Sequence, residues 1–71
     1  MPDFHPLTIE VEVEEDGRFL ACVSDLPGVM AYGGSREEAV RRVKSIALQI
    51  LADMIESGEE LPGSITGLFA A

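Results

Sequence analysis

The sequence predicts an α+β domain in which one long helix packs on one face of an antiparallel sheet, in the order strand, strand, strand, helix, strand. Three observations lead to this. Apolar and polar residues alternate from Leu7 to Glu14, an Asp-Gly pair separates that segment from a second apolar one, and a capped stripe of helical period follows Ser35. A helix laid across a sheet covers the apolar face of both. We expect residues 1–71 to form a single domain.

The first strand is expected over residues 7–14, because its apolar residues recur with period two. Glu10, Glu12 and Glu14 then share the opposite face. Three interpretations of this face are open: a solvated surface, a partner-binding surface, or a carboxylate cluster for a divalent metal or acid–base catalysis. Catalytic carboxylates need a partly desolvated cleft, which an exposed stripe does not provide.

A hairpin is predicted at Asp16-Gly17, because both turn positions tolerate positive φ. The return strand, residues 18–23, has apolar residues on both faces, which places it inside the sheet. Pro27-Gly28 then predicts a type II turn, since proline fixes φ and glycine adopts positive φ.

The third strand, residues 29–32, is short and carries no charged side chain. At a sheet edge such a strand is an unprotected template for pairing with another chain. Met30 and Tyr32 are therefore candidate contact residues for a dimer or a partner. The alternative is that the hairpin or the last strand covers this edge.

The helix is predicted over residues 36–57. Ser35 and Glu38 have the spacing of a capping box, and Gly58 suits the left-handed position that ends a helix. A last strand is expected over residues 64–69. The apolar stripe of the helix comprises Ala39, Val40, Val43, Ile46, Ala47, Ile50, Leu51, Met54 and Ile55.

The composition of the chain excludes several classes of function. Thirteen acidic and five basic residues give a net charge of −8, which argues against nucleic-acid binding. One cysteine and one histidine allow no internal disulfide and argue against a zinc site, and a lone cysteine fits the reducing cytoplasm. We expect no cofactor, no catalytic activity and no membrane span. A domain this small has a thin core, so a homo-oligomer or a partner is expected to add stability.

Five short motifs follow one another along the chain: Asp16-Gly17, Ala21-x-Val23, Asp25-Leu26-Pro27-Gly28, Gly34-Ser35-x-x-Glu38-Ala39 and Leu61-Pro62. In this order and spacing they resemble the HicB family of antitoxins over almost the whole chain. The resemblance implies a partial ribonuclease-H-like fold without nuclease activity. It also implies a small basic messenger-RNA-cleaving toxin, HicA, as the partner. Many members add a C-terminal DNA-binding segment, and because this chain stops soon after its expected last strand, we expect no direct DNA binding.

The leading hypothesis is an antitoxin-type protein that neutralises a HicA-like toxin by occluding its active site. Glu10, Glu12 and Glu14 would stand in for RNA phosphates, with Met30 and Tyr32 as further partner-binding residues. The alternative is an orphan HicB-like homo-oligomeric interaction protein without a toxin. A metal-dependent nuclease is a third hypothesis.

Overall fold

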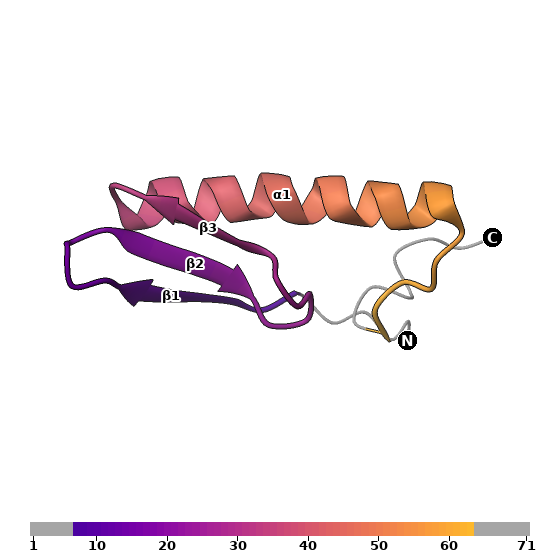
Figure 1. Cartoon of the computed structure of the whole chain (residues 1–71), viewed down its shortest axis with the longest axis horizontal. Helices are drawn as coiled ribbons and strands as arrows, with labels where there is room; N and C mark the ends of the chain where they lie inside the picture. The colour runs from indigo at the N-terminus through magenta and orange to yellow at the C-terminus, as the bar shows by residue number, and fades with distance from the viewer. Residues whose placement is uncertain (1–6, 64–71) are drawn as a thin grey trace, which may run out of the picture.

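The computed structural model describes residues 7–63. In chain order, the elements are β1 (Ile9–Val13), β2 (Phe19–Val23), β3 (Met30–Gly33) and α1 (Arg36–Ser57). They form a three-stranded antiparallel sheet in the order β1-β2-β3, with the long helix packed on one face (Figure 1). The predicted α+β class is thus confirmed for this part of the chain. The expected strand at residues 64–69 lies outside the described residues.

Strand β2 is the central strand, as the apolar residues on both of its faces predicted. Val11 of β1 and Ala31 of β3 both pair with Ala21, and this row faces the helix. Leu20 and Cys22 alternate with Ala21 and therefore lie on the opposite side of the sheet. We call that side the outer face.

The hairpin between β1 and β2 forms where predicted, but its turn differs from the expected one. Gly17 has φ 88°, but Asp16 does not have positive φ, since every residue of positive φ in the described part of the chain is a glycine. The Gly17 N–H donates to the Glu14 carbonyl at 2.9 Å, and the Glu14 N–H donates to the Arg18 carbonyl at 2.7 Å. This is a three-residue loop with a left-handed glycine, which needs only one residue of positive φ.

The turn between β2 and β3 is the predicted one. The Val29 N–H donates to the Leu26 carbonyl at 3.1 Å, and Gly28 has φ 83°. Pro27 and Gly28 therefore occupy the two central positions of the turn, while Leu26 and Val29 are buried at its ends. Strand β3 begins one residue later than predicted, at Met30.

The helix begins and ends at the predicted residues. The Ser35 hydroxyl accepts a hydrogen bond from the Glu38 N–H at 3.1 Å. The return bond differs from a standard capping box, because the Glu38 carboxylate accepts from the Gly34 N–H at 2.7 Å and not from Ser35. Gly58 (φ 76°) ends the helix in the left-handed conformation.

Small residues fill the space between sheet and helix. The buried apolar residues are Ala21, Val23, Leu26, Val29, Ala31, Ala39, Val43, Ala47 and Leu51. Four of these nine residues are alanines, whose small side chains let the two layers approach closely. The helix and the sheet lie especially close at the end of β3, where a Cβ on Gly33 would lie 2.5 Å from the Ala39 backbone nitrogen.

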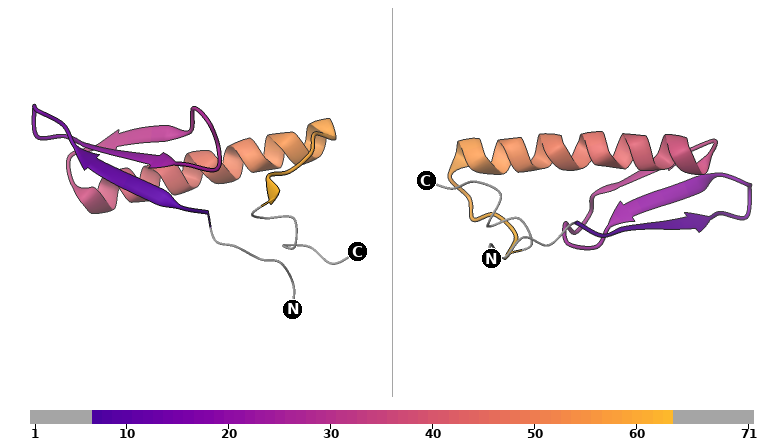
Figure 2. Two further views of the ribbon diagram at one scale, coloured as in Figure 1. Left: turned by 90° about the horizontal axis from the view of Figure 1, so that it is seen from below. Right: turned by 180° about the vertical axis from the view of Figure 1, so that it is seen from behind.

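The C-terminal half of α1 extends past the ends of the strands (Figures 1 and 2). Ile50 and Ile55, which the helical stripe predicted as core residues, are accordingly 38% and 50% exposed. Beyond the helix, the partly buried Leu61 packs back against the core.

Candidate protein-binding surface

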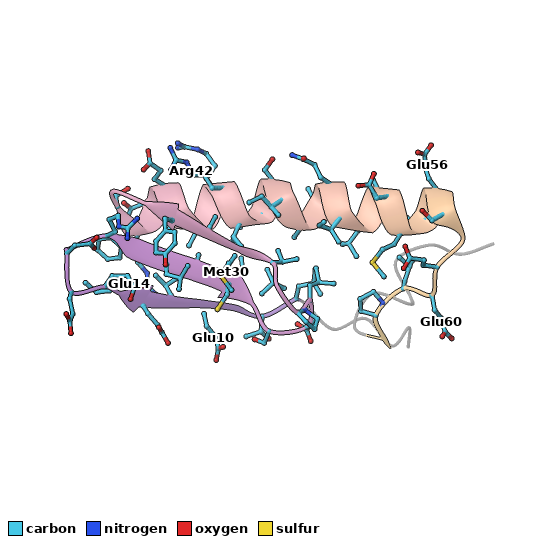
Figure 3. All side chains as sticks on the ribbon, in the orientation of Figure 1. Glu10, Glu14, Met30, Arg42, Glu56 and Glu60 are labelled. Atoms are coloured by element: carbon cyan, nitrogen blue, oxygen red, sulfur yellow. The ribbon has the colours of Figure 1, made fainter. Side chains whose placement is uncertain are left out.

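The outer face brings the five predicted partner-binding residues onto one surface. Two rows of paired residues cross the sheet: Glu10, Cys22 and Met30 form one, and Glu12, Leu20 and Tyr32 form the other. Side chains paired in this way have Cβ atoms about 4.5–5.5 Å apart. Glu14 follows Glu12 on the same face. We call these seven residues the outer-face patch; Figure 3 labels three of them, Glu10, Glu14 and Met30.

The outer-face patch has an acidic side and an apolar side. Glu10 and Glu12 are exposed along β1, at one edge of the sheet. Met30 and Tyr32 are 49% and 40% exposed along β3, at the other edge. The half-buried Leu20 and Cys22 of β2 connect the two sides, so the patch is an open surface that combines negative charge with exposed apolar area.

Tyr32 is held in place by charged neighbours. Its hydroxyl donates to Glu14 Oε1 at 3.3 Å, and the Arg18 guanidinium lies 4.3 Å from the centre of its ring. Arg18 Nε also bonds Asp16 Oδ2 at 2.7 Å. The Arg18 backbone N–H and then its side chain lower the pKa of Asp16 below the ordinary value, so this carboxylate stays charged. Because Arg18 is held by Asp16 in this position, its guanidinium group occupies one face of the Tyr32 ring.

Strand β3 is an edge strand of the described sheet, so the hairpin does not cover this edge. The expected last strand, which could also cover it, lies outside the described residues. The edge is not fully open, because Arg42 Nη1 donates to the Tyr32 carbonyl at 2.9 Å. Arg42 Nη2 also lies 3.6 Å from Glu38 Oε2, an ion pair between residues four positions apart on the helix. The capping of β3 by Arg42 was not predictable, since the two residues meet only when the helix packs on the sheet.

Cys22 is half-buried and free, with its sulfur 3.8 Å from the Glu10 carbonyl oxygen. Its partial exposure follows from its place on the open outer face. Ser24 Oγ lies 3.5 Å from Glu10 Oε2, so the Glu10 carboxylate has a neutral neighbour at this end of the row.

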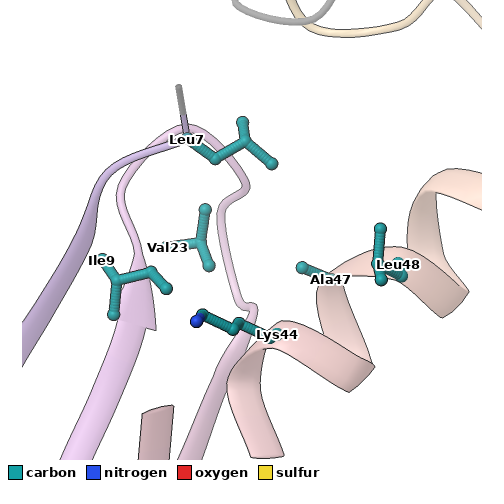
Figure 4. A pocket seen from close by; sticks show the side chains of 6 residues that line it. All are labelled: Leu7, Ile9, Val23, Lys44, Ala47 and Leu48. Carbon is teal, nitrogen blue, oxygen red and sulfur yellow. The ribbon is translucent and has the colours of Figure 1, made fainter. Parts of the chain in front are cut away.

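The carboxylates of the outer-face patch do not line a cleft. A cavity of about 250 Å³ lies on the other side of β1, against the helix, and its lining is mostly aliphatic (Figure 4). Among residues 7–63, no three His, Cys, Asp or Glu side chains are grouped so that they could hold a metal ion. Among the described residues, no helix is both long enough and apolar enough to span a membrane.

Comparison of the chain with protein-family models, with curated proteins and with solved structures gives no match. The fold and the outer-face patch together describe an α+β domain with a mixed acidic and apolar surface on its sheet.

Proposed function

We propose that the protein is an antitoxin-type binding protein, of the HicB kind, that covers the active site of a small basic HicA-type toxin. The observation that carries the proposal is the outer-face patch, which places three glutamates on the same face of the sheet as exposed Met30 and Tyr32, in a chain of net charge −8. Opposite charge raises encounter rates between proteins, and exposed aromatic and methionine side chains are enriched at interfaces. The proposed setting is the cytoplasm.

The proposed mechanism is occlusion. An enzyme that cleaves messenger RNA presents basic groups to the phosphates of its substrate. Glu10, Glu12 and Glu14 offer carboxylates to the same groups, and Met30 and Tyr32 offer exposed apolar area on the same face. Bound in this way, the protein excludes RNA from the toxin without any chemical step.

The topology supports the proposal at a coarser level. Three antiparallel strands followed by one long helix agree with the partial ribonuclease-H-like fold of the family that the sequence resembles. The proposal assigns no nuclease activity, because the glutamates run along one exposed strand, with about 6.6–7 Å between neighbours.

The test is to tag the full chain, express it in its native cells and identify by mass spectrometry what co-purifies in stoichiometric yield. A basic protein of under about 100 residues that is toxic when expressed alone is the expected result. Recovery of the protein alone, as a defined oligomer, would overturn the proposal and favour an orphan interaction protein without a toxin.

A further inference from the structure

The edge of β1 that faces away from β2 carries backbone groups that no described strand pairs with. Backbone groups point alternately to the two sides of an antiparallel strand. The Glu14 N–H donates to the carbonyl of Arg18, the residue just before β2. The even-numbered residues of this segment therefore direct their backbone groups toward β2. The N–H and C=O groups of Ile9, Val11 and Val13 therefore point to the free edge.

An apolar cavity borders this edge on the helix side. It measures about 250 Å³ and is lined by Leu7, Ile9, Val23, Lys44, Ala47 and Leu48 (Figure 4). Leu48 and Val13 are 67% and 65% exposed. An apolar cavity of about 150 Å³ accepts a benzene-sized group, so this one has room for a large aliphatic side chain.

The two sides of the edge differ in charge. The outer side carries Glu10, Glu12 and Glu14, whereas the helix side carries aliphatic residues and one cation, Lys44. Side chains of an added strand would alternate between these two sides. Basic residues complement the outer side, and aliphatic residues complement the cavity.

We propose that the free edge of β1 takes up an extended segment of the basic partner as an additional strand, a proposal that rests on the proposed function. The segment alternates Lys or Arg with aliphatic residues. Its backbone pairs with Ile9, Val11 and Val13, its aliphatic side chains enter the cavity, and its cations lie beside the glutamates. Addition of a strand to an open sheet edge is a common mode of peptide recognition, with backbone bonds giving affinity and alternate side chains giving specificity.

A second copy of this chain fits the edge less well. Antiparallel pairing of two β1 strands centred on Val11 would place Glu10 opposite Glu12 of the second copy, twice in each dimer. Like charges directly opposite each other destabilise a sheet. Each chain also carries a net charge of −8, which opposes self-association.

The test uses the full 71-residue chain, labelled with ¹⁵N, and amide hydrogen exchange measured by NMR. The probe is a seven-residue peptide that alternates lysine with valine or isoleucine, and the control is a peptide of the same composition with its lysines grouped together. We expect the alternating peptide to slow exchange of the Ile9, Val11 and Val13 amides about tenfold or more, and the grouped peptide to leave them unchanged.

A matched pair of variants tests the backbone contact separately. Val13→Pro removes an N–H that points away from β2, so it leaves the sheet's own bonds in place. Val13→Thr is the control, because it changes the same exposed side chain and keeps the N–H. Binding of the alternating peptide should weaken about tenfold in the proline variant and stay unchanged in the threonine variant.

Three results would overturn the proposal. Amides that stay unprotected with bound peptide would mean binding on the flat outer face alone, which leaves the proposed function standing. Protection already present in the free chain at every concentration would mean that residues 1–6 or 64–71 occupy the edge, and protection that grows with protein concentration would mean a second copy. Failure to co-purify a basic protein counts against the proposed function only, since the peptide experiment does not depend on that protein.

Discussion

The carboxylate of Glu38 links the end of β3 to the first turn of α1. It accepts from the Gly34 N–H at 2.7 Å and lies 3.6 Å from Arg42 Nη2. The Gly34 bond and then the charge of Arg42 lower the pKa of Glu38 below its ordinary value of 4.5. A carboxyl group whose pKa is lowered by folding stabilises the folded state at pH values above its ordinary pKa. This contribution is lost as the pH falls through the lowered pKa.

We therefore predict that Glu38→Gln flattens the pH dependence of stability below pH 4.5. The wild-type chain should lose more of its free energy of unfolding than the variant between neutral pH and a pH below that value. Urea unfolding of both proteins at the two pH values measures the difference. An equal loss in both would show that the Glu38 carboxylate does not contribute in this way.

Ser35 is the other half of the same helix start. Its hydroxyl satisfies the Glu38 N–H, which has no partner within the helix. Ser35→Ala should lower the free energy of unfolding by about 1 kcal/mol. Ser57→Ala, at the exposed last residue of the helix, is a control expected to change it by less than about 0.5 kcal/mol. Similar losses in urea unfolding for both variants would remove the special role of the cap.

At the scale of the elements, the contact between β3 and α1 depends on the absence of a side chain at Gly33. A Cβ there would lie 2.5 Å from the Ala39 nitrogen and 2.9 Å from its Cα, both backbone atoms that cannot rotate away. Gly33→Ala should force the helix and strand apart and cost about 1–3 kcal/mol.

Gly34→Ala is the matched control for this variant. Its Cβ would meet only the Glu38 Oε1 atom, at an ordinary 3.6 Å, and Gly34 does not have a positive φ. Denaturant unfolding of the two variants separates packing from backbone freedom, because both replace glycine by alanine. If Gly34→Ala were as damaging as Gly33→Ala, the close approach would not be the cause.

The elements were predictable because their signals are local. Ser35 and Gly58 mark the two ends of α1 by their own chemistry, and alternation marks β1. The exposure of Ile50 and Ile55 was not predictable in this way. A 22-residue helix is about 33 Å long and a five-residue strand about 17 Å, so one helical stripe outruns the sheet that covers it.

The candidate surface was predictable only in part, for a related reason. Alternation alone places Glu10, Glu12 and Glu14 on one face, but only the register through β2 puts Met30 in the same row as Glu10. The contacts of Tyr32 with Arg18 and Arg42 join residues 14 and 10 positions apart in the sequence, and no local pattern marks them.

For the whole molecule, the position of the negative charge matters more than its amount. The chain has thirteen acidic residues, so a charge effect on partner binding could arise anywhere on its surface. Glu56 and Glu60 lie at the far end of α1, well away from Glu10, Glu14 and Met30 of the outer-face patch (Figure 3). Glu59, next to Glu60 in the sequence, is also exposed. Reversing these three charges changes the net charge by the same amount as reversing the three glutamates of the outer-face patch, but at a different place on the surface.

We predict that Glu10→Lys, Glu12→Lys and Glu14→Lys together weaken the complex with a co-purified basic partner by about 100-fold or more, because attraction becomes repulsion at the contact. The control combines Glu56→Lys, Glu59→Lys and Glu60→Lys, and should weaken it by less than about tenfold through long-range charge alone. Titration calorimetry at two salt concentrations measures both. Since salt screens distant charges more than those in contact, the loss in the control should shrink in high salt while the loss in the outer-face variant largely remains. Equal affinities for the two variants would place the binding surface elsewhere on the molecule.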